Sequence, residues 1–165
     1  MTGTVKLLRF ALTALLAAAL AIGVTAPVAA EADEAILDEM VALEESKLDL
    51  WYGESDPSAY VAEVAEDATA YDAFVPMKRD VGEGIRESYR SFEGLIPHID
   101  YRIVDPAVDV RGDIVIFTFF VEGTNVDDPD LPYGPWNATK VMNRTGDGWE
   151  MIHTHFSAPP PPPEA

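Results

Sequence analysis

The sequence predicts an α+β domain in which a curved antiparallel sheet wraps around about three N-terminal helices. Residues 31–66 show the three- and four-residue apolar spacing of helices, whereas residues 98–157 show mainly strand-like alternation. Gly- and Pro-containing turns separate the predicted strands. Helices grouped before strands are typical of α+β domains, and we expect a cavity between the two layers.

The first thirty residues are predicted to be a secretory signal peptide. Lys6 and Arg9 form a positive start, residues 10–26 are uncharged and mostly apolar, and Val28 to Ala30 are small residues suited to cleavage after Ala30. A membrane anchor is the alternative, but the apolar stretch is short for a span. We therefore expect a secreted or periplasmic protein with no membrane attachment after cleavage.

The chain is strongly acidic. It carries a formal net charge of −18, and loss of the predicted signal peptide with its two basic residues would make this −20. Such a charge argues against nucleic acid and anionic membranes as partners. The sequence contains no Cys, which removes disulfides, thiolate metal sites and Cys nucleophiles.

Two helices are predicted first. Residues 31–52 form a broad apolar stripe, and a second helix begins at Asp56-Pro57, with Asp as N-cap and Pro as the first helical residue. The inner face of this second helix contains Tyr60, and the helix is expected to end near Glu66.

A short strand and a third helix follow. Residues 68–75 alternate like a strand, with Asp72 near its end. Asp80 gives a weak capping signal for a helix that Gly94 terminates.

Two long strands come next. Residues 98–110 alternate imperfectly, with a bulge expected at Asp105-Pro106. Residues 114–121 are apolar on both strand faces. Helices can cover one of these faces, so a partner subunit is expected to cover the other, and we predict a homo-oligomer.

The last structured segment is a hairpin over residues 136–157, after a connecting loop at 125–135. Its turn is expected at residues 145–148. Because side chains alternate along a strand, His153 and His155 lie on the same strand face. We divide the chain into a signal peptide (1–30), one domain (31–158) and a Pro-rich extended tail (159–165).

Three stretches of the chain resemble the nuclear transport factor 2-like (cystatin-like) superfamily. Residues 54–72 and the third helix, Gly82-Glu-Gly-Ile-Arg-Glu-Ser-Tyr89, look like passages of SnoaL-like proteins and ketosteroid isomerases. Residues 140–157, with a Trp after the turn and a closing His-Thr-His-Phe-Ser, are similar to the association domain of calcium/calmodulin-dependent kinase II. This resemblance implies a cone-shaped domain with a pocket, which commonly dimerises through the opposite sheet face.

The resemblance also implies a catalytic candidate. Asp72 matches the general base of ketosteroid isomerases, and a carboxylate in an apolar pocket can transfer protons near neutral pH. The oxyanion-stabilising positions of that family carry Leu48 and Lys140 here, so the catalytic set is incomplete. In the alternative, Asp72 is a structural residue at the end of the strand, and backbone groups cap its side chain.

Lys140 and Arg144 share strand parity, so both cations can point into the cone and favour an anionic ligand. Exposed surface charges are the alternative reading. Tyr60 and Trp136 are candidates for the ligand-binding wall. His153 and His155 could hold a metal only with a third ligand that the sequence does not place, so we predict no metal and no cofactor.

The predicted function is an exported, oligomeric domain whose pocket holds a small organic ligand, with an anion as a candidate. The alternative is a cofactor-free SnoaL-like enzyme for proton transfer, isomerisation or hydrolysis. That enzyme would use Asp72 as general base with His155 or Lys140 as its partner.

Overall fold

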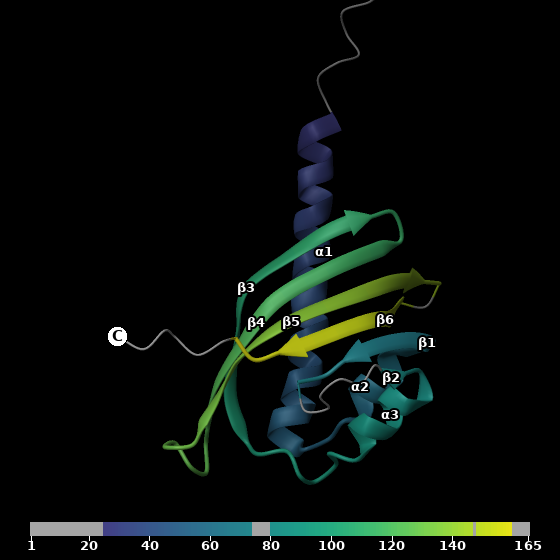
Figure 1. Ribbon diagram of the computed structural model, residues 1–165. Helices are drawn as coiled ribbons and strands as arrows, with labels where there is room; N and C mark the ends of the chain where they lie inside the picture. Colours follow the sequence, from purple (N-terminus) through teal and green to yellow (C-terminus); the bar gives the residue numbers. More distant parts are fainter. Residues whose placement is uncertain (1–24, 74–79, 147, 160–165) are drawn as a thin grey trace, which may run out of the picture. The chain divides into compact units, whose positions relative to one another are not determined.

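The computed structural model describes residues 25–73, 80–146 and 148–159 (Figure 1). Most of the predicted signal peptide and of the Pro-rich tail lies outside these residues. The chain divides into two compact units, Met1–Ala32 and Asp33–Ala165. Helix α1 begins in the first unit, and the second unit contains the sheet and the other helices. No helix in the described part has the length and apolar character needed to cross a membrane.

The described residues form four helical segments: α1 (Thr25–Leu48), the π-helical segment η1 (Asp49–Glu54), α2 (Ser58–Glu63) and α3 (Glu83–Arg90). The buried side of α1 carries Met40, Glu44, Lys47 and Leu48 at helical spacing, so it includes two charged residues. The N-cap of α2 falls on Pro57 rather than on the predicted Asp56.

In the part of the chain that the structure describes, six strands form one sheet that is not closed: β1 (Val64–Tyr71), β2 (Asp80–Val81), β3 (Ile99–Arg111), β4 (Ile114–Asn125), β5 (Pro132–Thr145) and β6 (Gly148–Ser157). The strand order is β2-β1-β6-β5-β4-β3. The predicted α+β class is confirmed.

The sheet and the end of the second helix differ from the prediction. β1 pairs in parallel with β6, so the sheet is mixed rather than antiparallel. The second helix stops at Glu63, because Val64 and Ala65 are buried in β1 and do not extend the helix to residue 66. β5 begins at Pro132, inside the predicted loop, because Pro132 and Tyr133 pair with β4.

The bulge predicted at Asp105-Pro106 is confirmed. The register between β3 and β4 shifts between Val104 and Ala107, and Asp105 has a φ of 50°. A bulge bends its strand and increases the local twist. This distortion contributes to the curvature of the sheet that Figure 1 shows.

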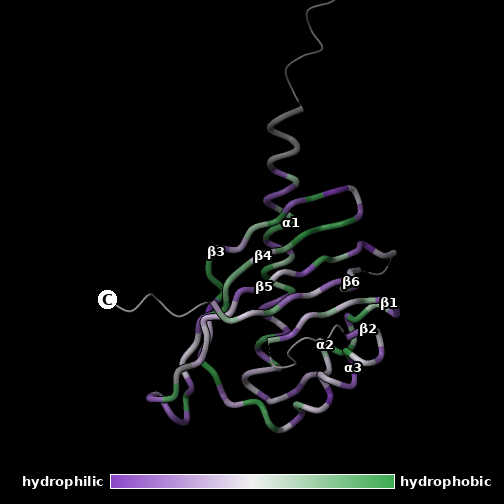
Figure 2. Tube along the Cα trace, in the orientation of Figure 1, coloured by the Kyte–Doolittle hydropathy of each residue, from purple (hydrophilic) through white to green (hydrophobic). Residues whose placement is uncertain are grey.

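β4 is apolar on both faces, as the sequence predicts, and its hydrophobic colour is visible in Figure 2. We call the sheet face that packs against the helices the inner face; there β4 contributes Val115, Phe117, Phe119 and Val121, all buried. We call the opposite face the outer face; there β4 contributes Ile114, Ile116, Thr118 and Phe120. The side chain of Phe120 on this face is 41% exposed.

Candidate functional site

A cavity of about 340 Å³ lies between the helices and the inner face of the sheet. Side chains from η1, α2, α3 and four strands line it, and nine of these side chains are aromatic. A largely apolar cavity of this size is typical of sites for small organic molecules. The cavity is therefore the candidate functional site.

One group of rings is centred on Trp51 of η1. Its ring centroid lies 5.2 Å from that of Tyr60, 5.9 Å from that of Tyr89 and 5.8 Å from that of Phe92. The Tyr60 and Tyr89 contacts are edge-to-face, the arrangement that the ring quadrupoles favour. These rings come from α2, α3 and the segment after it, so the Trp51 group joins the helical side of the cavity.

A second group of rings is centred on Tyr52, the next residue of η1. Its centroid lies 5.4 Å from that of Tyr133 on β5, which in turn lies 6.1 Å from that of Trp136. The Tyr133 hydroxyl donates a hydrogen bond of 2.6 Å to the Tyr52 hydroxyl. Consecutive residues of one π-helical turn thus anchor two walls of the cavity, and π-helical turns are frequent at functional sites.

Behind Tyr60 lies a cluster that we call the buried ion network, made of Glu44, Lys47, Glu63 and Lys140. Lys140 Nζ donates to Glu44 Oε2 at 2.7 Å and to Glu63 Oε1 at 2.8 Å. Lys47 Nζ lies 3.0 Å from Glu44 Oε2 and also pairs with Glu63. The Tyr60 hydroxyl donates to Glu44 Oε1 at 2.8 Å. Two cations and two anions make the network electrically neutral.

The network favours the charged forms of Glu44 and Lys47. Burial alone would raise the pKa of Glu44, but the attraction of Lys140 and then of Lys47 outweighs it and lowers the pKa to about 2. Burial likewise opposes the charge of Lys47, yet Glu44 and Glu63 raise its pKa. Burial, followed by the negative charge of Glu44, raises the pKa of Tyr60 well above its ordinary value. Tyr60 therefore presents its ring to the cavity while its hydroxyl stays protonated.

The structure brings three of the sequence-predicted site residues to the cavity: Tyr60, Asp72 and Trp136. Leu48, which occupies an oxyanion-stabilising position of the isomerases, also lines it. Asp72 is close enough to Tyr89 that its charge helps to raise the pKa of that tyrosine, after burial and Glu63.

The two predicted cations are placed differently. Lys140 points to the inner side as its strand parity predicts and is 1% exposed, but its ammonium group is bound within the buried ion network and does not line the cavity. Arg144 is exposed near the hairpin turn, with its guanidinium 4.1 Å from the ring of Trp149. Neither cation lines the cavity.

His153 and His155 belong to the outer face. They alternate with Thr154, which lines the cavity on the inner side, and neither histidine lines it. His153 Nδ1 lies 2.7 Å from the hydroxyl of Thr69, and both imidazoles lie about 6 Å from the ring of Tyr71. Across residues 25–73, 80–146 and 148–159, no three His, Cys, Asp or Glu side chains gather as a metal site would require. His155 is thus not brought together with Asp72.

Sequence reasoning missed Thr154, although its opposite parity to His153 and His155 was visible in the sequence. Thr154 is 2% exposed and lines the cavity. Its hydroxyl oxygen is buried without a hydrogen-bond partner among the described residues. A buried polar group of this kind requires an explanation.

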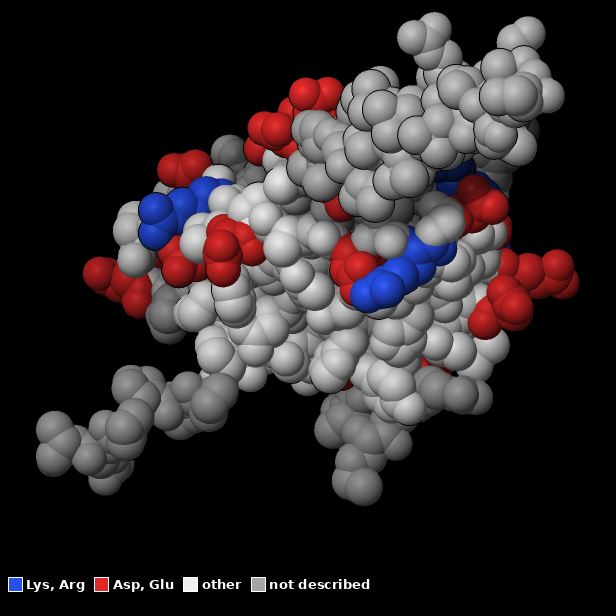
Figure 3. All heavy atoms as spheres, turned by 90° about the horizontal axis from the view of Figure 1, so that it is seen from above, with Lys and Arg blue, Asp and Glu red and all other residues white. Residues whose placement is uncertain are grey.

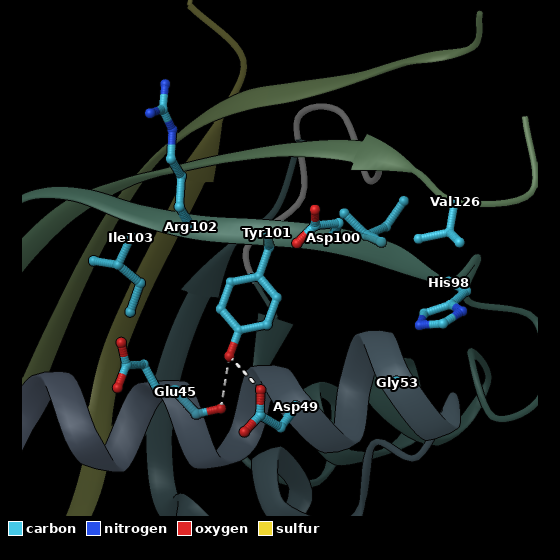
Figure 4. Close-up of a pocket in the computed structure, with 10 residues that line it drawn as sticks. Glu45, Asp49, Gly53, His98, Asp100, Tyr101, Arg102, Ile103 and Val126 are labelled. Carbon is cyan, nitrogen blue, oxygen red and sulfur yellow. Dashed lines mark hydrogen bonds between the residues drawn. The ribbon is translucent and has the colours of Figure 1, made fainter. Parts of the chain in front are cut away.

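A larger hollow of about 750 Å³ lies between η1, the end of α1 and the edge strand β3 (Figure 4). Tyr101 crosses it, and the Tyr101 hydroxyl donates to Asp49 at 2.6 Å and to the backbone oxygen of Glu45 at 3.0 Å. Arg102 points away from the helix in this view. The hollow is open and polar, and its central hydroxyl is already satisfied, so the enclosed aromatic cavity is the stronger candidate site.

Comparisons with known proteins agree with this geometry. A family model described as SnoaL-like domain matches residues 49–161. No curated protein matches the chain. Among solved structures, the chain is similar to a Parabacteroides distasonis protein provisionally assigned as a ketosteroid isomerase, with 27% identity, a TM-score of 0.61 and coverage of 74% of this chain and 86% of that one.

Two further structures show the same fold at lower identity. An NTF2-like protein of unknown function from Pseudomonas putida has 23% identity and a TM-score of 0.65, covering 76% of this chain and 88% of that one. The association domain of C. elegans CaMKII has 15% identity and a TM-score of 0.64, covering 78% and 99%. The predicted cystatin-like fold is thereby confirmed.

Proposed function

The chain belongs to the SnoaL-like domain family, and on this premise we propose that it binds a small organic molecule in the aromatic cavity. Domains of this family enclose a pocket, but fold alone does not fix function. The observation that carries the proposal is the cavity itself, about 340 Å³ lined by nine aromatic side chains. Aromatic walls provide a large apolar contact area and a defined shape for a bound ring.

The charges around the cavity favour an uncharged ligand over the anion expected from Lys140 and Arg144. Among the described lining residues, the acidic side chains are Asp72 and Asp80, and no Lys, Arg or His is present. The net charge of the chain is −18, and acidic side chains are spread over the face seen in Figure 3. An anionic ligand would meet repulsion at this site, whereas a neutral ring would meet apolar contacts.

A cavity-filling substitution tests the proposal. Ala70 is 6% exposed and lines the cavity, so Ala70→Phe places a ring in the space for the ligand. Ala107→Phe is the matched control, because Ala107 is exposed on β3 and outside the cavity. The uncharged dye N-phenylnaphthylamine should fluoresce on binding to the wild type and to Ala107→Phe, with affinity reduced about tenfold or more in Ala70→Phe. Equal dye affinity in all three proteins would contradict the proposal.

Cofactor-free proton transfer is the second candidate function, and the position of Asp72 in the cavity favours it. A carboxylate beside apolar rings can act as a general base. The partners expected from sequence are not available, since Lys140 is bound in the buried ion network and His155 lies on the outer face. Deuterium exchange at the carbon next to the carbonyl of β-tetralone, followed by NMR, tests this function. Exchange that Asp72→Asn abolishes would support it, and exchange at the buffer rate would exclude it for this probe.

We further propose that the protein is a homo-oligomer joined through the outer face of the sheet. Ile116 on β4 and Val141 on β5 are directly opposite each other there, and Phe120 is 41% exposed. Apolar residues on adjacent strands form the kind of continuous patch that mediates association. Similarity to association domains of CaMKII supports an assembly of copies.

Export remains part of the proposal. It is based on the apolar segment at residues 10–26 and the small residues before Glu31. Intact-mass measurement of the protein from the culture medium or periplasm of a bacterial host is the test. A mass that corresponds to a start at Glu31 supports export, and an uncut chain retained in the cells contradicts it.

A further inference from the structure

The hydroxyl of Thr154 is a buried polar group at the cavity wall, and the inference that we draw from it rests on the proposed binding function. Thr154 lies in the middle of β6, with Ala70 of β1 on one side and Lys140 of β5 on the other. Neither neighbour partners its hydroxyl: alanine has no polar side chain, and the Lys140 ammonium is directed to Glu44 and Glu63. The Oγ1 atom is therefore buried at the cavity wall without a hydrogen-bond partner among the described residues.

Three of the five tyrosine hydroxyls that line the cavity contrast with this group. The Tyr60 hydroxyl donates to Glu44, and the hydroxyls of Tyr52 and Tyr133 bond to each other. These hydroxyls are therefore engaged within the protein. Valine would fill the space of Thr154 with nearly the same shape and no polar atom, so the hydroxyl is unfavourable for folding unless something else bonds to it.

The two ring groups define the shape of the rest of the ligand. Trp51 and its neighbours belong to the helical side, whereas Tyr52, Tyr133 and Trp136 connect η1 to the sheet. Trp51 and Tyr52 are adjacent in η1, so these two walls are built on one element. A planar ring system is the shape that aromatic walls contact best.

We propose that Thr154 is the polar recognition residue of the cavity and that the ligand is an uncharged aromatic molecule bearing one hydroxyl or carbonyl group. The ring system packs between the two ring groups, and its polar group exchanges a hydrogen bond with Thr154 Oγ1. A hydroxyl can donate or accept, so it suits either polar group. A site built around such a hydrogen bond discriminates against the analogue that lacks the polar group.

Three probes of one ring system test the proposal: naphthalene, naphthol and naphthoate. Calorimetric titration of each probe with the wild type, Thr154→Val and Thr154→Ser compares the same shape with no polar group, a neutral one and a charged one. The wild type should bind naphthol about tenfold more tightly than naphthalene, and naphthoate more weakly than naphthol. Thr154→Val should bind naphthol about tenfold more weakly than the wild type does, with naphthalene affinity equal or higher, and Thr154→Ser should keep the preference for naphthol.

The outcomes separate this inference from the proposed function. If wild type binds naphthalene and naphthol equally, or if Thr154→Val keeps the preference for naphthol, the recognition role of Thr154 is overturned while the cavity remains a binding site. If naphthoate binds more tightly than naphthol, the uncharged class of ligand is overturned. If N-phenylnaphthylamine and all three probes fail to bind to the folded wild type, the proposed function itself fails.

Discussion

The ammonium nitrogen of Lys140 lies 2.7 Å from a carboxylate oxygen of Glu44, and each side chain is 1% exposed. The two residues are 96 positions apart in the chain, so their contact joins α1 to the middle of β5. Charges buried this deeply are tolerated because both are paired and hydrogen-bonded. This ion pair also explains why Lys140 is unavailable to a ligand in the cavity.

Removing the cation of this pair should destabilise the fold strongly. Lys140→Met leaves Glu44 and Glu63 with only Lys47 to balance them, and breaking a buried ion pair from one side costs about 3–5 kcal/mol. Arg111→Met is the control, because Arg111 pairs with Asp109 on the exposed surface, where such pairs contribute about 1 kcal/mol or less. Urea denaturation measures the difference. A loss below about 1 kcal/mol in Lys140→Met would show that the buried ion network contributes little to stability.

A compensating substitution separates charge from packing. Lys140→Met/Glu63→Gln restores equal numbers of buried positive and negative charges, so the double variant should recover part of the stability that Lys140→Met loses. If the double variant is less stable than Lys140→Met, the loss arises from the missing hydrogen bonds rather than from unbalanced charge.

Stability should fall in acid partly because of Glu44. Its folded-state pKa is about 2 against an ordinary value of 4.5, so the unfolded chain binds more protons between these pH values. The contribution of Glu44 is therefore fully present above about pH 4.5 and is lost as the pH falls towards 2. Unfolding free energies across this range should decrease less steeply in Glu44→Gln than in the wild type. Glu87→Gln, at an exposed position, should keep the wild-type slope, and identical slopes in all three proteins would contradict this assignment.

A charge on the outer face should break the proposed oligomer. Ile116→Glu places a carboxylate on the apolar patch beside Val141, and burying an unpaired carboxylate in an interface is strongly unfavourable. Sedimentation velocity should show an oligomer for the wild type and a folded monomer for Ile116→Glu. Asp109→Glu, on the neighbouring strand, keeps its charge and should remain oligomeric. A monomeric wild type would contradict the proposed association through the outer face.

Mild acid should weaken association through the same face, because it protonates His153. Burial, and then the charge of His155, lowers the pKa of His153, so the folded state favours the neutral imidazole. Its contribution to stability is present above its ordinary pKa of 6.5 and decreases as the pH falls through that value. His153 pairs with Val141 across β5 and β6, so its protonation would bring a positive charge into the proposed interface. The fraction of dissociated protein should therefore be larger at about pH 5.5 than at about pH 7.5. His153→Gln should reduce this difference, and an unchanged difference would assign it to other groups.

Sequence reasoning identified much of the fold because local patterns determine much of it. The two-faced apolar run of β4 and the bulge at Asp105 were both visible as alternation and its interruption. The parallel pairing of β1 with β6 was not predictable, since Thr69 and His153 are brought together only by tertiary packing. Local periodicity contains no information about the relative direction of strands so far apart.

The candidate site, like the fold, could be predicted from the sequence only in part. Strand parity correctly placed the side chain of Lys140 on the inner side, but it could not show that Glu44 and Glu63, 96 and 77 positions away, neutralise the charge. Thr154 was overlooked because a threonine on a strand is ordinary, and its missing hydrogen-bond partner appears only when its neighbours are known. Long-range partners of polar groups are thus the part of the site that the sequence did not reveal.

Native mass spectrometry of the protein, purified without refolding, tests the central claim that the cavity holds a small organic molecule. The native spectrum should show an oligomer with an additional mass that is released on denaturation, is retained in Ala107→Phe and is absent from Ala70→Phe. Fragmentation of the released compound would then show whether it is an uncharged aromatic molecule. The same additional mass on Ala70→Phe, whose cavity is filled, would contradict the claim, because the molecule would then be bound elsewhere.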